Sequence, residues 1–120
     1  MNIELAFALL VLLFLKHFVV DFITQTETMV KEKGIYGAWG GIVHSSQHAL
    51  LTGWIILIFA PELAIILAFA DGIIHYHIDW AKMQIGKGLT PADKNFWVYL
   101  GLDQLLHYIT YLGIAYVAVS

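Results

Sequence analysis

The chain has 120 residues, of which 60% are hydrophobic and 12% are charged, and its formal net charge is −3. This balance is unlike that of a soluble globular protein and predicts one integral membrane domain over residues 1–120. Cysteine is absent, which excludes thiolate metal sites, disulfides and cysteine nucleophiles. The basic residues are scattered lysines without a basic patch, so we expect the lipid bilayer, and not a nucleic acid, as a partner.

Four apolar segments have about the length of a membrane-spanning helix, which is roughly 20 residues. The first covers residues 3–30 and lacks a basic leader and a cleavage site, so we expect a retained helix. The second and third cover residues 39–60 and 62–82 and are separated by a very short turn at Pro61. The fourth covers residues 95–119. The predicted fold is therefore all-α, a bundle of four transmembrane helices with a buried polar layer.

Lysines flank the first and third connections, whereas the second connection and both termini have none. The positive-inside rule then places the two lysine-bearing connections in the cytoplasm and both termini outside. Lys82 lies at the cytoplasmic mouth of the third segment, where it either attracts an anionic substrate or extends to the lipid headgroups.

Each apolar segment carries histidine and aspartate residues four positions apart, a spacing that places them on one face of a helix. Ionisable groups inside apolar helices are costly and indicate function. Counting from the lysine-bearing ends places all of them about 5 to 18 Å from the cytoplasmic boundary. They therefore form one layer, in which we expect eight metal ligands: His17, Asp21, His44, His48, His75, Asp79, Asp103 and His107.

Imidazole and carboxylate groups on facing helices are the ligands from which helix bundles build metal sites. Four aspartates, with Asp71 included, would be balanced by two divalent cations, which we expect to be zinc or manganese. Iron is less favoured, because the glutamates lie at helix ends or in loops. The alternative is a network of hydrogen bonds and ion pairs that only holds the helices together.

Other polar residues have supporting roles or stay outside the layer. Asp71, His75 and Asp79 follow one another at this spacing, and each is turned by about 40° around the helix from the one before. Only two of the three are then expected to reach one ion, and Asp71 is expected to orient a histidine instead. His77 projects almost opposite His75 and is not expected to bind metal. Lys16 either pairs with a carboxylate or faces a partner subunit. The remaining residues expected to contact the ligands are Gln25, Lys33 and Gln104.

The motifs read HFVVDFITQTETMVKEK at 17–33, HSSQH at 44–48, HYHIDWAK at 75–82 and DQLLH at 103–107. Together they closely resemble the bacterial and phage membrane family named domain of unknown function 3307. The resemblance implies the cytoplasmic membrane of a bacterium and no defined activity, and a looser similarity links the chain to small membrane proteins described as metal-dependent hydrolases. Asp71, Lys16 and His77 do not match signature positions of the family. Those that match are His17, Asp21, Gln25, Lys33, His44, His48, His75, Asp79, Lys82, Asp103, Gln104 and His107.

Three functions fit this layer. The first is a membrane metallohydrolase acting on a lipid-linked or phosphoester substrate, with Asp21 or Asp79 as general base and Lys33 or Lys82 holding a phosphate. The second is a transporter or channel for divalent ions or protons, which the apolar outer half of the helices disfavours unless a homo-oligomer forms a pore. The third is a structural or regulatory protein stapled by metal.

Overall fold

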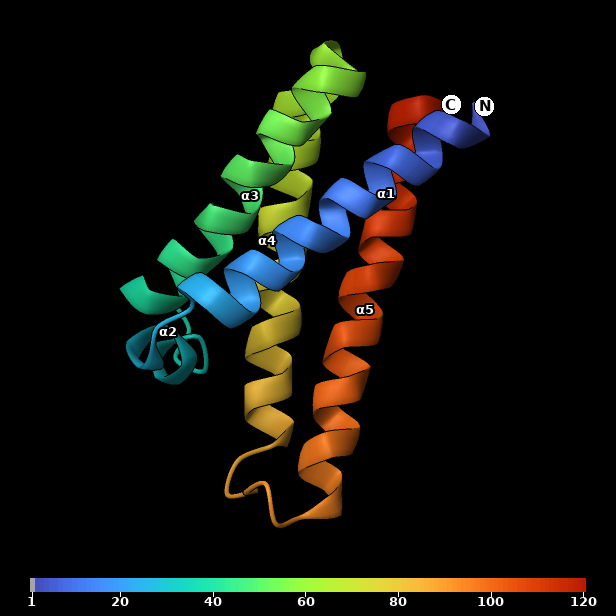
Figure 1. Ribbon diagram of the computed structural model, residues 1–120. Coiled ribbons are helices and arrows are strands. Elements are labelled where there is room, and N and C mark those ends of the chain that lie inside the picture. Colours follow the sequence, from blue (N-terminus) through green and yellow to red (C-terminus); the bar gives the residue numbers. More distant parts are fainter. Residues whose placement is uncertain (1) are drawn as a thin grey trace.

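The computed structural model describes residues 2–120, which form an all-α bundle without a β-strand in that range (Figure 1). The first segment and three long helices run through the molecule. A short helix over residues 27–32 packs against the long helix that begins at Trp39. A 3₁₀ turn, Pro61–Leu63, joins the second and third long segments. The α-helices are α1 (Ile3–Phe18), α2 (Glu27–Glu32), α3 (Trp39–Phe59), α4 (Ala64–Ile85) and α5 (Lys94–Val119).

The first segment, expected as one helix over residues 3–30, is divided. Helix α1 continues into a π-helical turn, Val19–Thr24, and Gln25 then adopts an extended backbone with φ −68° and ψ 120°. The Gln25 side chain donates to the Asp21 carbonyl at 2.9 Å, and Thr26 begins α2 by accepting from the Met29 amide at 3.2 Å. Polar side chains therefore replace the backbone hydrogen bonds that a continuous helix would make.

Helices α3 and α4 form a closely packed hairpin. A Cβ atom on Gly72 would lie 2.9 Å from Ala49 Cβ, and one on Gly53 would lie 3.2 Å from Ala68 Cβ. Small residues at such positions allow two membrane helices to approach each other closely. The close approach places the histidines of α3 next to those of α4.

The two ends of the bundle differ in character. Both termini and the α3–α4 turn lie at one end in Figure 1, and the loop between α4 and α5 lies at the other. We call the first end the apolar end, because side chains near the termini and the turn form the hydrophobic core there. Its buried members are Leu9, Leu13, Ile56, Ala60, Ala64, Leu67, Tyr111, Ile114 and Ala115.

The bundle is apolar outside and polar inside. In the part of the chain that is described, twelve polar or charged side chains are buried, against ten apolar ones. Large apolar side chains face outward instead, as with Phe7, Ile58 and Ile65, which are 63%, 72% and 77% exposed. This arrangement is the one expected of a protein whose surroundings are lipid.

Three segments are long and apolar enough to cross a membrane: Ile3–Thr24, Trp39–Phe59 and Pro61–Ile85. Helix α5 is 26 residues long but is not among them, since Asp103, Gln104 and His107 reduce its apolar character. The structure thus indicates a membrane protein with an all-α fold and a buried His/Asp layer. Of the four spanning helices that were predicted, three have the length and composition to cross a membrane.

Candidate metal centre

The eight residues expected as ligands come together in the interior of the bundle. Their side chains come from α1, the π-helical turn, α3, α4 and α5, and the Nε2 atom of each histidine is directed at a carboxylate. We call this set the His/Asp cluster. Its members are His17, Asp21, His44, His48, His75, Asp79, Asp103 and His107.

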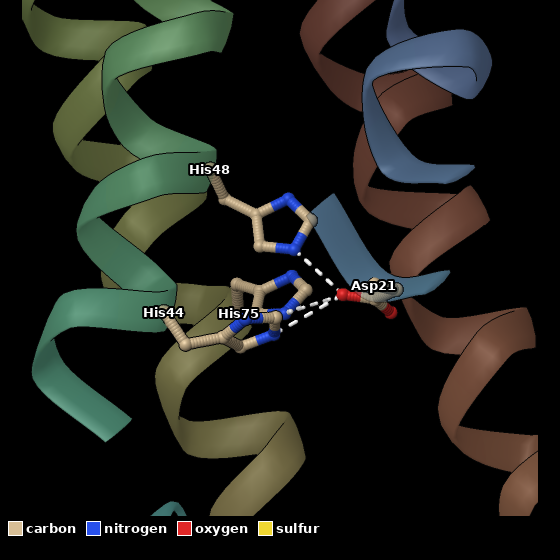
Figure 2. Close-up of side chains that lie close together, drawn as sticks. All are labelled: Asp21, His44, His48 and His75. Atoms are coloured by element: carbon tan, nitrogen blue, oxygen red, sulfur yellow. Dashed lines mark hydrogen bonds and ion pairs between the residues drawn. The ribbon is translucent and has the colours of Figure 1, made fainter. Parts of the chain in front are cut away.

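The first group of possible ligands surrounds one oxygen of Asp21 (Figure 2). The Nε2 atoms of His48, His44 and His75 lie 2.8, 3.1 and 3.8 Å from Asp21 Oδ1. Four donor atoms arranged tetrahedrally around zinc, each about 2.0–2.1 Å from the ion, lie roughly 3.4 Å apart. The spacing of the group therefore suits a small divalent cation.

The second group adjoins the first and shares His75 with it. Asp79 Oδ2 lies 3.1 Å from His75 Nε2, and Asp79 Oδ1 lies 3.0 Å from His107 Nε2. Asp103 Oδ1 lies 3.4 Å from the same atom of His107. One imidazole nitrogen has one lone pair, so His75 can serve only one of two ions. The cluster thus contains two adjoining groups that can hold metal.

The π-helical turn sets the position of Asp21. A π-helical turn is wider than an α-helical one and is common at functional sites. From this turn the Asp21 carboxylate contacts His17 of its own segment at 3.2 Å and also reaches His44 of α3. The Asp21 side chain is 6% exposed. The turn therefore aims a buried carboxylate across the bundle.

Some atoms of the cluster have no hydrogen-bond partner. Within residues 2–120, every buried side-chain atom lacking a partner belongs to His44, His75, Asp79 or Asp103, and both ring nitrogens of the two histidines are included. Buried polar groups are normally paired, because leaving one unpaired is costly. The Nε2 atoms and carboxylate oxygens among them lie 3.1–3.4 Å from their nearest neighbours in the cluster, and a bound cation would accept their lone pairs.

Amide and ammonium groups surround the cluster. Gln104 accepts from His17 Nε2 at 2.7 Å and donates to Asp103 at 3.0 Å. The buried Lys33 ammonium donates to Gln25 Oε1 at 3.0 Å and lies 3.6 Å from Asp79 Oδ2. These contacts place the predicted supporting residues beside the possible ligands. Lys82 lies farther out, in the wall of a groove that also contains Asp103.

The model of the family described as protein of unknown function (DUF3307) matches residues 9–120. The chain belongs to this family. No curated protein and no solved structure is significantly similar to the chain. The looser similarity to metal-dependent hydrolases therefore has no support from these comparisons, and the chemistry of this DUF3307 member has to be argued from its own geometry.

A second polar network lies between the cluster and the apolar end. Lys16 forms an ion pair with Asp71 at 2.9 Å, and Thr52 donates to the same oxygen at 2.5 Å. Tyr111 Oη lies 3.1 Å from Lys16 Nζ. Asp71 is thus linked to the cluster through Lys16, whose Nζ lies 2.9 Å from His48 Nδ1.

Sequence reasoning missed two members of this second network. Thr52 follows His48 by four positions, and Tyr111 follows His107 by four, so an extension of the same spacing would have found both. His77 lies outside the cluster, where its Nε2 forms a hydrogen bond with Tyr36 Oη at 2.9 Å.

Proposed function

We propose that this membrane protein is a metal-dependent hydrolase. It holds two divalent cations, zinc or manganese, in the His/Asp cluster and cleaves a lipid-linked substrate or another phosphoester near the cytoplasmic leaflet. The observation that carries the proposal is the pair of adjoining ligand groups in the interior of the bundle. Several of their buried atoms have no hydrogen-bond partner. Divalent cations at such a site supply Lewis acidity, which activates water for attack on an ester bond.

The charges around the cluster support an anionic substrate. Lys16 balances the charge of Asp71, which leaves the carboxylates of Asp21, Asp79 and Asp103. Two divalent cations exceed those three negative charges by one, and Lys33 adds a further positive charge beside Asp79. An anionic group is therefore required for balance, and a phosphoester provides it.

The chain's own residues have separate roles in this proposal. Asp21 or Asp79 accepts the proton of the attacking water through an oxygen that does not bind a cation. Lys33 and Lys82 hold the phosphate from the side of the α4–α5 loop. Because the side chains of Asp21 and Asp79 are only 6% and 2% exposed, bulk water has little access to the reacting bond.

A groove between α4 and α5 supports a substrate with an apolar chain. It encloses about 550 Å³, and its walls include Ile74, Ile78, Leu102 and Leu106 together with Lys82 and Asp103. An acyl or prenyl chain in this groove would place its anionic headgroup near Lys82 and its ester beside Asp103. The substrate would then enter sideways from the lipid.

The proposal includes the membrane topology. Helix α5 serves as the fourth spanning helix, since its 26 residues are about 39 Å long and its polar side chains face the cluster. The positive-inside rule places α2 and the α4–α5 loop in the cytoplasm and both termini outside, in the cytoplasmic membrane of a bacterium.

The apolar end weighs against transport. An ion or proton crossing the membrane would have to pass Leu9, Leu13, Ile56 and Ile114, which pack together with no more than 5% of any of them exposed. Such a packed apolar segment is a barrier to ions and protons, so it disfavours a route through a single chain. A purely structural metal site is the remaining alternative, and it would leave Lys82 and the groove without a role.

The test compares two histidines two positions apart on α4. Elemental analysis of protein purified in mild detergent should find about two transition-metal ions per chain. His75→Ala should retain at most one of them, because His75 adjoins both groups, whereas His77→Ala should retain both. Folded wild-type protein without stoichiometric metal would contradict the proposal.

Hydrolysis is tested on the metal-loaded protein with a chromogenic phosphodiester and with phospholipid vesicles. Lys82→Gln should lower turnover and leave the metal content unchanged, because Lys82 lies in the groove and not among the possible ligands. Stoichiometric metal without turnover of any phosphoester or acyl ester would favour the structural alternative.

A further inference from the structure

The Lys16 side chain has its full set of hydrogen-bond partners in the interior of the protein. An ammonium group has three N–H donors and no acceptor. Its three partners are Asp71 Oδ2 at 2.9 Å, His48 Nδ1 at 2.9 Å and Tyr111 Oη at 3.1 Å. The Asp71 carboxylate keeps this cation paired, so the three bonds have a defined direction.

The bond to His48 decides where that ring carries its proton. Because Lys16 donates to His48 Nδ1, this nitrogen presents its lone pair, and the ring proton is on Nε2. His48 Nε2 lies 2.8 Å from Asp21 Oδ1 and therefore donates to it. A protonated Nε2 has no lone pair for a cation.

A second path from Lys16 reaches His17 in the same way. Tyr111 Oη accepts from Lys16, so its own proton is donated to His17 Nδ1 at 2.8 Å. The proton of His17 is then on Nε2, which donates to Gln104 Oε1 at 2.7 Å. The amide of Gln104 agrees with this direction, because its nitrogen donates to Asp103 at 3.0 Å.

The other histidines of the first group differ in this respect. Neither ring nitrogen of His44 or His75 has a hydrogen-bond partner within the described residues. Their Nε2 atoms lie 3.1 and 3.8 Å from the Asp21 oxygen that His48 contacts. Carboxylates of Asp21 and Asp79 lie near these Nε2 atoms, but no donor makes either Nδ1 an acceptor. Each ring can therefore carry its proton on Nδ1 and present the Nε2 lone pair to a cation.

We propose that Lys16 is a positioning residue that makes His17 and His48 hydrogen-bond donors and so removes them from the set of metal ligands. The proposal rests on the metal centre described above. Six of the eight expected ligands remain: Asp21, His44 and His75 for one ion, and Asp79 and His107, with Asp103 beside His107, for the other.

Sets of three protein ligands have a chemical consequence. Structural zinc sites have four protein ligands, whereas catalytic sites have three and keep a position for water or substrate. With His48 as a fourth ligand the first ion would be closed to substrate. By donating to Asp21, His48 instead orients that carboxylate, as residues next to metal ligands commonly do.

The proton positions are tested by ¹⁵N NMR on metal-free protein in detergent with labelled histidine. His17 and His48 should show a protonated Nε2 and an unprotonated Nδ1. Cadmium-113 is then added as the probe. Coupling to the metal should appear for His44, His75 and His107, and not for His17 or His48. Coupling to His48 or His17 in the wild type would overturn the proposal.

Two substitutions on α3 form a matched pair. His48→Gln keeps an N–H donor for Asp21 and should still bind about two cadmium ions per chain, whereas His44→Gln should lose one. Lys16→Met should free His48 to bind, so that cadmium coupling to His48 appears. A loss of one cadmium ion in His48→Gln would overturn the proposal even if Lys16→Met fails to fold.

The same spectra distinguish this proposal from the proposed function. If the wild type binds no cadmium but His17 and His48 have the expected protons, the metal centre is wrong and the role of Lys16 in fixing protons stands. If cadmium binds and the protons are on Nδ1, the metal centre stands and the role of Lys16 is wrong.

Discussion

The apolar end and the His/Asp cluster are parts of the same helices, yet they are held together by different forces. Leu9, Leu13 and Ile56 pack without directional bonds. Shortening one of these side chains therefore lowers stability in proportion to the packing contacts that are lost. In the cluster each charge depends on a specific partner, and the removal of one partner leaves the other unpaired in a medium without water. Stability is therefore distributed at one end and concentrated in a few side chains at the other.

The largest effect is expected at the boundary between these regions. Lys16→Met leaves Asp71 as an unpaired buried charge, and breaking a buried ion pair costs about 3–5 kcal/mol. Unfolding in detergent, followed by circular dichroism, measures the loss. Combining Lys16→Met with Asp71→Leu removes both charges and should recover much of it. A double variant no more stable than Lys16→Met would contradict the ion pair's importance.

A substitution in the apolar end should have a smaller effect, confined to stability. Leu13→Ala removes packing from a fully buried side chain and should cost about 2 kcal/mol. The metal content should stay at the wild-type value, because Leu13 belongs to the apolar core and is not one of the possible ligands. A loss of metal in this variant would show that the two regions are coupled, contrary to the comparison.

Gly72→Ala tests the close contact between α3 and α4. The added Cβ would lie 2.9 Å from Ala49 Cβ, so the two helices must shift, at a cost of about 1–2 kcal/mol. Thermal unfolding measures this cost. Ala49→Gly in the same chain removes the opposing methyl group and should restore stability, and a failure to do so would place the strain elsewhere.

The smallest effect is expected for Gln104→Ala. The variant loses the hydrogen bonds to His17 and Asp103, which together contribute about 1 kcal/mol. Thr110→Ala on the same helix is the control, since Thr110 bonds only to the backbone of its own helix and should leave stability unchanged. Equal losses in the two variants would remove Gln104 from the network.

Helical spacing was enough to predict the membership of the cluster. His44 and His48 lie one helical turn apart, and a bundle that buries one of them on a given face also buries the other. The same reasoning kept His77 out, because a shift of two positions turns a side chain almost to the opposite face. The ligand roles themselves remain predictions.

Contacts between different helices could not be read from spacing. Lys16 reaches α3, α4 and α5 at once, which depends on how far apart those helices pack, and its sequence context allowed a partner subunit equally well. The division of the first segment at Gln25 was also missed. There the Gln25 side chain takes the place of a backbone donor to the Asp21 carbonyl, a contact that the spacing of residues does not reveal.

The α3–α4 hairpin has a consequence for biogenesis. Membrane helices insert before they associate, and the short 3₁₀ turn at Pro61–Leu63 keeps α3 and α4 next to each other from the start. That unit already carries His44, His48, His75 and Asp79. Asp21 and His107 come from the π-helical turn and from α5, so the cluster is complete only once those segments pack against the hairpin. In the metal centre proposed above, a cation bound by ligands from both the hairpin and the other segments would stabilise the completed assembly over its separate parts.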